Sequence, residues 1–445
     1  MVLLMAILHI GIDDTDSGEY GGCTTYIGAL LVERLSREKV EFIDYPNLIR
    51  LNPNIPFRTR GNAAVVLRLK ISDNYLEKIK DIVINVVENF SMIKDPKTNP
   101  GIVFYNGSIT DDLKNFYYKA VRGFVTLDEA IKLIKKHNMH SYKIKKGLGI
   151  IGATAGIGAD LTKDYTFELL AYRYHDHREK IRKIDSLSVK IMDLLLGDVT
   201  FNNYDYFSKR VLISPHGLDP VLFGVRGEYA ECVYIASKLI QAYEPIERWV
   251  IFRTNQGTDA HMTLKKISEL KEYDCGIIEG IVEYPPRVIQ GGHTFFVIKD
   301  NTGSVTCAVY APTGMLNKVA RMLCPGDTVR VFGSLVRKNN VINFNVEKME
   351  ILSLAKKYVL RNPQCPKCGK TMTSAAKNKG FKCKNCGYKT KNLTKVKVNV
   401  PRSIKIGIYV SDKKAQRHLT KPIERYDIKL PKPSIDRLID LWHFP

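Results

Sequence analysis

The chain has 445 residues, of which 44% are hydrophobic and 26% are charged. This length fits two to four domains, and the composition excludes a chain that is mainly disordered. The formal net charge is +22, and +18 of it falls in residues 356–445, which hold 23 Lys and Arg against 5 Asp and Glu. A basic C-terminal module indicates binding to a polyanion, while the nearly neutral remainder needs another explanation.

The first residues and the cysteines predict a cytoplasmic protein. Residues 1–12 are apolar, but they lack a basic start and a cleavage site and run directly into Asp13. We therefore interpret them as a buried strand and not as a signal peptide. No segment approaches the ~20 apolar residues of a membrane span, so we expect no membrane contact. The nine cysteines show no disulfide pattern, which favours a reducing compartment.

The predicted elements of the first 260 residues alternate between strands and helices, which indicates a multidomain α+β protein. We expect a kinase-like, ATP-binding α/β domain in 1–120, with parts of 190–260 added to it, and a ferredoxin-like catalytic region in 121–260. The elements that support this division are strands at 6–12 and 63–71, helices at 24–35, 75–90, 124–137 and 229–243, a strand or helix at 165–174, and strands within 211–252.

Residues 273–353 predict an OB-fold β-barrel. Three strands, a helix and two strands follow one another within about 80 residues, which is the element order of that fold. OB barrels bind oligonucleotides, although another small antiparallel barrel fits the same pattern. The expected strands are 276–284, 293–299, 304–310, 328–336 and 341–350, with a helix at 312–324.

Two CxxC pairs predict a zinc ribbon at 360–395, followed by a basic C-terminal segment at 396–445. Each pair places two thiolates on a tight turn, and two such turns close a tetrahedron around Zn²⁺. A closed four-cysteine site is structural and not catalytic. The predicted ligands are Cys365, Cys368, Cys383 and Cys386.

Three carboxylates at the end of the first predicted strand indicate a metal–phosphate site. Asp13, Asp14 and Asp16 repel one another unless a cation such as Mg²⁺ shares them. Directly after them, Gly21, Gly22, Thr24 and Thr25 open a predicted helix, whose amides favour a phosphate. The alternative is a solvated acidic turn in which Thr24 only caps the helix.

Two further segments have weaker signals. Gly147, Gly149 and Gly152 match GxGxxG and follow Lys146, which indicates either backbone close to a phosphate or tight glycine packing. The segment from Arg58 to Asn62 offers two guanidiniums, including that of Arg60, for nucleotide or RNA phosphate, or it forms a plain turn before a strand.

Long motifs in this order resemble a known family. They are HIGIDDTDS, GGCTTY, LIRLNPNIPFRTRGN, KTNPG, GLGIIGATAGIGAD, TFELLAYRY, LFGVRGE and CPKC…CKNC. Together they are similar to the 2-agmatinylcytidine synthetases of minor isoleucine tRNA, over essentially the whole chain. The resemblance implies a kinase-like domain, a ferredoxin-like domain, an OB-fold and a zinc ribbon.

The resemblance also implies a reaction. ATP would phosphorylate O2 of the wobble cytidine, and the agmatine amine would then displace it at C2, changing decoding to AUA. The tRNA would be contacted at its anticodon loop and acceptor region. Asp13, Asp14 and Asp16 would hold Mg²⁺, and Thr24, or its neighbour Thr25, would be the family's autophosphorylated threonine. The residues assigned to nucleotide or RNA are Thr15, Gly21, Gly22, Thr25, Arg60, Asn62, Lys146, Gly147, Gly149 and Gly152.

Agmatine is a dication, so we expect its pocket to offer carboxylates or carbonyls together with an aromatic face. The candidates from sequence are Asp160, Glu168, Asp219 and Glu228. Two other function classes stay open at this stage: a different ATP-dependent RNA-modifying enzyme, and a non-enzymatic OB-fold and zinc-ribbon protein that binds single-stranded nucleic acid. The second leaves the first 250 residues unexplained.

Overall fold

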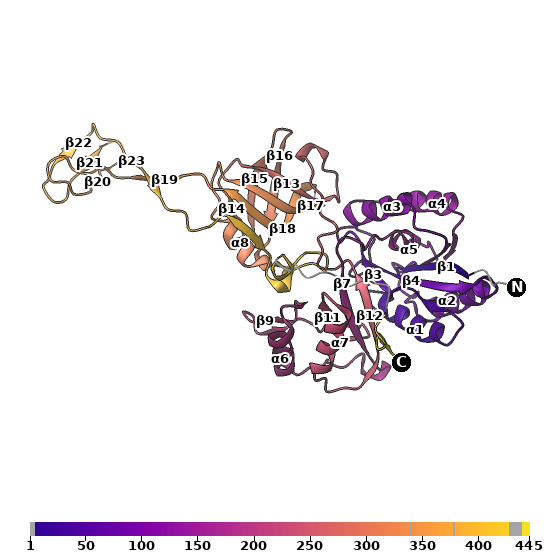
Figure 1. The fold of residues 1–445 in the computed structure, drawn as a ribbon. Coiled ribbons are helices and arrows are strands. Elements are labelled where there is room, and N and C mark those ends of the chain that lie inside the picture. The colour runs from indigo at the N-terminus through magenta and orange to yellow at the C-terminus, as the bar shows by residue number, and fades with distance from the viewer. Residues whose placement is uncertain (1–4, 339, 377–378, 427–437) are drawn as a thin grey trace.

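The computed structural model describes residues 5–338, 340–376, 379–426 and 438–445. A large α/β body is followed by a β-barrel, and a small module extends away from the barrel on a two-stranded stalk (Figure 1). Within these residues, no helix has both the length and the apolar character needed to cross a bilayer.

One continuous sheet of eleven strands forms the centre of the large body. Central strands such as residues 63–72 are mainly apolar and buried over most of their length, Arg68 included, because helices cover both faces of the sheet. The segment 165–174, which the sequence left as strand or helix, is a strand. The strands are β1 (Met5–Asp13), β2 (Glu41–Phe42), β3 (Asn47–Arg50), β4 (Ala63–Ser72), β5 (Gly101–Asn106), β6 (His140–Lys143), β7 (Thr166–Arg173), β8 (Thr200–Phe201), β11 (Val221–Gly227), β12 (Ile246–Thr254) and β25 (His443–Phe444).

The strand order is β6-β5-β1-β4-β3-β12-β7-β11-β8, with β2 added to β4 and β25 added to β12. The parallel pairing of β3 with β12, at Asn47 opposite Arg253, joins the first six strands of the chain (β1–β6) to the later strands β7, β8, β11 and β12. The first 260 residues therefore share one sheet and one main core.

Helices cover this sheet on both faces (Figure 1). Three of them were not predicted, at 111–122, 149–157 and 186–196, and the helix predicted at 124–137 begins at residue 127. The domain boundary that we expected between residues 120 and 121 falls inside the helix at 111–122. The helices are α1 (Thr24–Ser36), α2 (Leu76–Phe90), α3 (Asp111–Arg122), α4 (Leu127–Lys136), α5 (Gly149–Ile157), α6 (Ser186–Leu196) and α7 (Ala230–Leu239).

Helix α5 is formed by the glycine-rich run and is buried almost completely. Its backbone lies directly on the strands: a Cβ at Gly11 of β1 would be 2.3 Å from the Ala153 oxygen, and one at Gly101 of β5 would be 2.1 Å from the Ile150 nitrogen. The glycines therefore allow a close approach of helix to sheet, as the tight-packing interpretation expects.

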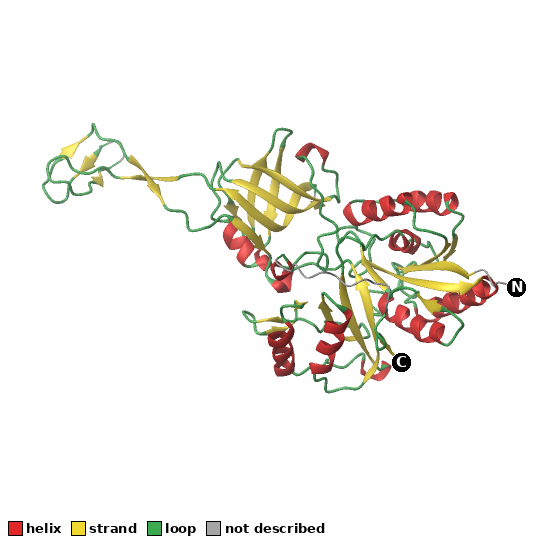
Figure 2. Ribbon diagram, in the orientation of Figure 1, coloured by secondary structure: helices red, strands yellow, loops and turns green. Residues whose placement is uncertain are grey.

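The barrel has the predicted OB order of three strands, a helix and two strands. Pairing of the first strand, 275–282, with the strand 294–299 closes it, and its core contains Phe296, while Phe295 on the other face is half-buried. Figure 2 shows it as a nearly all-strand body. Its elements are β13 (Cys275–Val282), β14 (Arg287–Val288), β15 (Thr294–Lys299), β16 (Ser304–Val309), α8 (Met315–Ala320), β17 (Thr328–Lys338), β18 (Val341–Ser353) and β24 (Gly407–Val410).

The stalk and the zinc module are built from short strands (Figure 2). They are β19 (Lys357–Arg361) and β23 (Val396–Val400) in the stalk, and β20 (Thr373–Ser374), β21 (Phe381–Lys382) and β22 (Lys389–Thr390) in the module. In the large body, β9 (Tyr204–Asp205) pairs with β10 (Arg210–Val211). Short 3₁₀ helices lie at Asp73–Tyr75, His175–His177, Ile267–Glu269, Ala311–Thr313, Lys413–Ala415 and Ile423–Arg425.

The segment predicted as a basic tail, 396–445, takes part in several of these bodies, and its residues 427–437 lie outside the described ones. It contributes β23 to the stalk and β24 to the barrel, and β25 pairs with β12. Between the last two, Arg425 forms an ion pair with buried Glu228 of the large body. Part of its positive charge is therefore used inside the protein.

Candidate active site and zinc site

The acidic turn at the end of β1 is buried and short of partners. Asp13 Oδ1 accepts a hydrogen bond of 2.7 Å from the Asp14 amide, and Asp14 Oδ2 accepts one of 3.1 Å from the Asn99 amide. Asp14 Oδ1 has no hydrogen-bond partner among the described residues. Burial, with the neighbouring acids, raises the pKa of Asp13 to about 7 and that of Asp14 to about 8. A cation shared by Asp13 and Asp14 would relieve both the burial and the repulsion. In the described part of the chain, however, only the four cysteines of the small module converge as a cluster of metal ligands, and the three carboxylates do not.

The loop that carries the acids is held rigidly. Thr98 donates a hydrogen bond of 2.7 Å to the Asp16 carbonyl, and Ser17 donates one of 2.5 Å to Asp95. Lys145 Nζ donates to three carbonyl oxygens of the neighbouring segment, those of residues 93, 95 and 98. Lys145 is therefore a structural clamp, while its neighbour Lys146 is exposed.

Helix α1 begins beside this turn and brings the two threonines to it. Thr15 donates a hydrogen bond of 3.0 Å to Thr24 Oγ1, and the Cys23 and Thr25 side chains lie 3.0 Å apart. The entry to the helix requires glycine, because φ is +80° at Gly21 and +75° at Gly22. In addition, a Cβ on Gly21 would be 2.6 Å from the Leu218 oxygen.

A cavity of about 260 Å³ opens next to Thr24 and Thr25. Arg60 lines this cavity. It forms an ion pair with Asp219, lies 3.9 Å from Asp16, and donates a hydrogen bond of 2.7 Å to the Gly22 carbonyl. The cavity thus joins the threonines to both acidic and basic groups.

A second, smaller cavity of about 90 Å³ lies on the other side of the acidic turn. Asp13 and Asp14 line it, and so do Gly149 and Gly152 of α5 together with an apolar wall that includes Phe57. A Cβ on Gly152 would be only 1.7 Å from Asp13 Oδ2. The glycines therefore leave the space that the Asp13 carboxylate fills.

Two residues connect the cavities. Thr59 and Asn62 line both of them. Thr59 counters part of the rise in the pKa of both Asp14 and Asp16, and Asn62 Nδ2 donates a hydrogen bond of 2.7 Å to the Asn52 carbonyl. Thr59 was missed from the sequence, although it stands between the arginines of a segment already singled out.

The acids proposed for a dication fall into two groups. Glu168 and Asp219 line the larger cavity, where Glu168 pairs with Arg226 at 2.9 Å and Asp219 pairs with Arg60 and Arg182. Asp160 instead bonds to Thr162, and Glu228 is paired with Arg425.

Arg50, Arg226 and His418 also line the larger cavity, and none of them was given a role from the sequence. Arg50 and Arg226 lie within two of the quoted family motifs, whereas His418 lies in none of them. His418 comes from the C-terminal segment, and its Nδ1 lies 3.2 Å from Arg226 Nη2. Since Nδ1 accepts from Arg226, the proton of the neutral ring belongs on Nε2. Arg50, followed by burial, holds the pKa of His418 well below its usual range.

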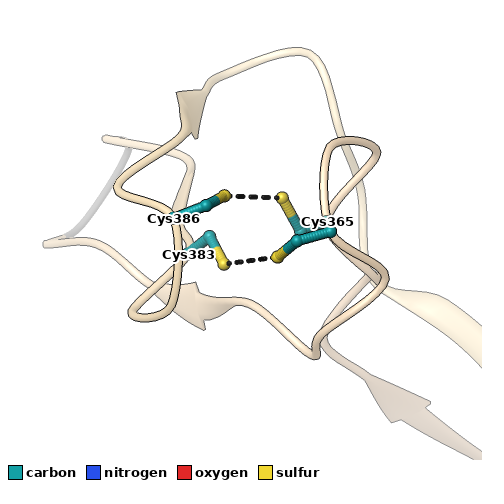
Figure 3. Close-up of side chains that lie close together, drawn as sticks. Cys365, Cys383 and Cys386 are labelled. Atoms are coloured by element: carbon teal, nitrogen blue, oxygen red, sulfur yellow. Dashed lines mark hydrogen bonds between the residues drawn. The ribbon is translucent and has the colours of Figure 1, made fainter.

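The four predicted zinc ligands converge in the small module. Cys365 and Cys386 Sγ lie 3.5 Å apart, as do Cys368 and Cys383 Sγ, and all four sulfurs lie within 4.8 Å of one another (Figure 3). Tetrahedral Zn²⁺ with bonds of ~2.3 Å fits this set. Gly369 and Gly387, which follow the pairs, have φ of +71° and +77°, as the turn requires.

The larger cavity, lined by Asp16, Thr24 and Thr25, offers groups for catalysis, and the OB barrel and zinc module are typical of nucleic-acid binding. Together they indicate an enzyme that modifies nucleic acid. Family models agree with this class. Residues 9–146 match the TiaS TCKD domain, 147–261 the TiaS FLD domain, 275–352 the OB-fold nucleic acid binding domain, and 362–404 the TiaS C-terminal zinc ribbon domain.

Curated relatives are similar over nearly the full length. The isoleucine tRNA 2-agmatinylcytidine synthetase TiaS of Pyrococcus horikoshii is 44% identical over 94% of this chain and 97% of its own, and that of Methanocaldococcus jannaschii is 40% identical over 95% and 100%. The chain belongs to this family, the isoleucine tRNA 2-agmatinylcytidine synthetases. A crystal structure of TiaS in complex with its isoleucine tRNA and ATP, 39% identical, matches 97% of this chain and all of that one with a TM-score of 0.85. A complex of TiaS with the same tRNA, AMPCPP and agmatine, 37% identical, matches the same shares with a TM-score of 0.82.

Proposed function

We propose that this protein uses ATP to join agmatine to C2 of the wobble cytidine of minor isoleucine tRNA, giving 2-agmatinylcytidine and AUA decoding. The carrying observation is the match along the whole chain to a TiaS complex with isoleucine tRNA and ATP. The cavity beside Thr24 and the acidic turn supports the proposal, because it joins groups for phosphate and for cations.

The chemistry requires activation of a poor leaving group. A phosphoryl group from ATP is transferred to O2 of cytosine, and the agmatine amine then attacks C2, so that the C2–O bond breaks and the oxygen leaves on phosphate. The phosphoryl transfer leaves ADP, and water then cleaves the remaining anhydride bond, so that ATP ends as AMP and two phosphates, one of which is the group that left C2. Mg²⁺, when bound, would neutralise the phosphate charge and align the reacting groups.

In this scheme the acidic turn and the threonines are the phosphate side of the site. Asp13, Asp14 and Asp16 are the residues that would hold Mg²⁺. Thr24, whose Oγ1 already lies in a hydrogen bond with Thr15, is the threonine that becomes phosphorylated, with Thr25 as its neighbour. The remaining residues assigned to nucleotide or RNA are Gly21, Gly22, Arg60, Asn62, Lys146, Gly147, Gly149 and Gly152.

We assign the agmatine side of the site to Glu168 and Asp219. Both line the cavity, and each already pairs with an arginine guanidinium, the group that agmatine itself carries. Bound agmatine would compete with these arginines for the carboxylates. The first 260 residues thus perform the chemistry, and the barrel (273–353), the zinc ribbon (360–395) and the basic segment (396–445) hold the tRNA.

The test is transfer of labelled agmatine to unmodified minor isoleucine tRNA, with and without ATP and Mg²⁺. We expect labelling at the wobble cytidine that depends strictly on both, and none on the same tRNA with uridine at that position. Asp14→Ala should abolish labelling, while Asp81→Ala, at an exposed position of α2, should preserve it. Intact tRNA binding without any labelling by the wild type would refute the proposal.

A further inference from the structure

A third hollow, of about 410 Å³, lies next to the larger cavity and is strongly basic. Among the described residues that line it, none is acidic. Its charged walls are formed by Arg50, Arg58, Arg60 and Arg417, and the neutral ring of His418 lies beside them. We call this hollow the basic groove.

The positive charge of the groove is only partly neutralised. Arg60 pairs with Asp219, and Arg417 lies 3.3 Å from Glu347. In the described part of the chain, neither Arg50 nor Arg58 forms an ion pair; Arg58 donates only to the Arg60 carbonyl. Burial, with nearby arginines, lowers the pKa of Arg50 to about 10, and partial burial with Arg417 lowers that of Arg58. Guanidiniums held close together with only part of their charge neutralised favour an anion between them.

The groove is continuous with the larger cavity. Arg50, Arg60 and His418 line both hollows. The opposite wall is fixed from two sides: Arg417 Nη1 donates a hydrogen bond of 2.7 Å to Asn54 in the large body, while its Nε approaches Glu347 on β18 of the barrel. The groove therefore lies where the OB barrel meets the mouth of the cavity.

We propose that the basic groove binds an RNA phosphodiester adjacent to the nucleotide whose base enters the larger cavity. This rests on the proposed function. A base that reacts inside a protein must leave its stack, and the backbone on each side then lies at the cavity mouth. Arginine forks match phosphate oxygens there. The phosphates of ATP are the other source of the same chemistry. The acidic turn argues for RNA, because Asp13, Asp14 and Asp16 line the two cavities and not the groove.

Arg58→Gln tests the proposal in the full-length protein. Arg58 is exposed and has no ion pair to lose, so we expect the variant to fold with an unchanged Tm. Loss of a charged contact worth ~1.5–3 kcal/mol should weaken tRNA binding about 10-fold or more. The slope of log Kd against log salt should fall by about 0.7, and KM for ATP should not change. Arg58→Lys should restore the slope. Arg37→Gln, at an exposed position after α1, is the matched control and should behave as wild type.

A tRNA with neutral methylphosphonate linkages beside the wobble position locates the contact. Wild type should lose affinity for it as Arg58→Gln does, and Arg58→Gln should lose no more. Additive losses would overturn the proposal. A raised KM for ATP with unchanged tRNA affinity would assign the groove to ATP, and no change in either would show that it holds no phosphate. If wild type transfers no agmatine but Arg58→Gln still weakens tRNA binding, the groove stands and the proposed reaction fails.

Discussion

Gly152→Ala should inactivate the enzyme by displacing one carboxylate. A Cβ at this position would lie 1.7 Å from Asp13 Oδ2 and 2.7 Å from its Cγ, whereas real Cβ contacts stay above 3.0 Å. The Asp13 carboxylate must therefore move by roughly 1.3 Å, which is the difference between the 3.0 Å limit and the 1.7 Å contact. Alanine is better than glycine inside a helix by about 1 kcal/mol, so helix α5 itself does not oppose the change. A misplacement of about 1 Å in a reacting site costs ~10²-fold in rate.

The assay is the initial rate of agmatine transfer, together with the Tm and the affinity for tRNA. We expect at least a 100-fold loss of rate, a stability loss of about 1–3 kcal/mol from overpacking, and intact tRNA binding. Gly156→Ala, one turn later on α5, is the control. Its Cβ would lie 2.8 Å from Val66 Cγ2 and would not approach Asp13, so it should lower Tm with far less effect on rate. Equal rate losses in both variants would refute the reasoning.

Three further predictions concern the acids, the zinc and the C-terminal residues. Without divalent cations, the pKa of Asp13 (about 7) and of Asp14 (about 8) lie above the ordinary 3.8. Their contribution to stability is therefore complete below about pH 4 and is lost as pH rises through 7 and 8. Because the buried carboxylates are charged above these values, Mg²⁺ should raise Tm more at about pH 9 than at about pH 6. An equal rise at both pH values would contradict the prediction. Cys365→Ser should abolish zinc binding, measured by metal analysis, and weaken tRNA binding; unchanged affinity would separate the ribbon from tRNA capture. Trp442→Ala should cost about 3–5 kcal/mol in chemical unfolding, because its ring packs against Phe42 and Tyr45; a loss below about 1 kcal/mol would show that the packing contributes little.

Local patterns were sufficient for the barrel and for the zinc ligands. Strand alternation and the order of elements identify an OB fold. Each CxxC pair holds two thiolates together on one short turn, so the four zinc ligands can be named from the sequence. Helix α5 escaped prediction because its glycines have poor helix propensity. What stabilises it is close contact with β1 and β5, and that contact depends on residues such as Gly11 and Gly101, far away in the sequence.

The candidate active site likewise combines residues that are close in the sequence with residues that only the fold brings together. Asp13, Asp14, Asp16 and Thr24 lie near one another because a strand, a loop and a helix follow directly, and this adjacency is visible in the sequence. Arg50, Arg226 and His418 reach the cavity only through the folding of three distant segments. The roles given to Arg60, Asn62, Lys146 and the glycines stay predictions.

The pairing of β25 with β12 has a consequence for biosynthesis. On one edge β12 pairs with β7, while its other edge is shared by β3 at Arg253 and by β25 at Trp249. The last strand is translated only after the barrel and the ribbon. A nascent chain therefore exposes part of the β12 edge until synthesis passes residue 444. The strand that covers this part of the β12 edge therefore folds onto the sheet only after the barrel and the ribbon have been made, and a chain cut before residue 443 would leave Trp249 and Val250 without that neighbour.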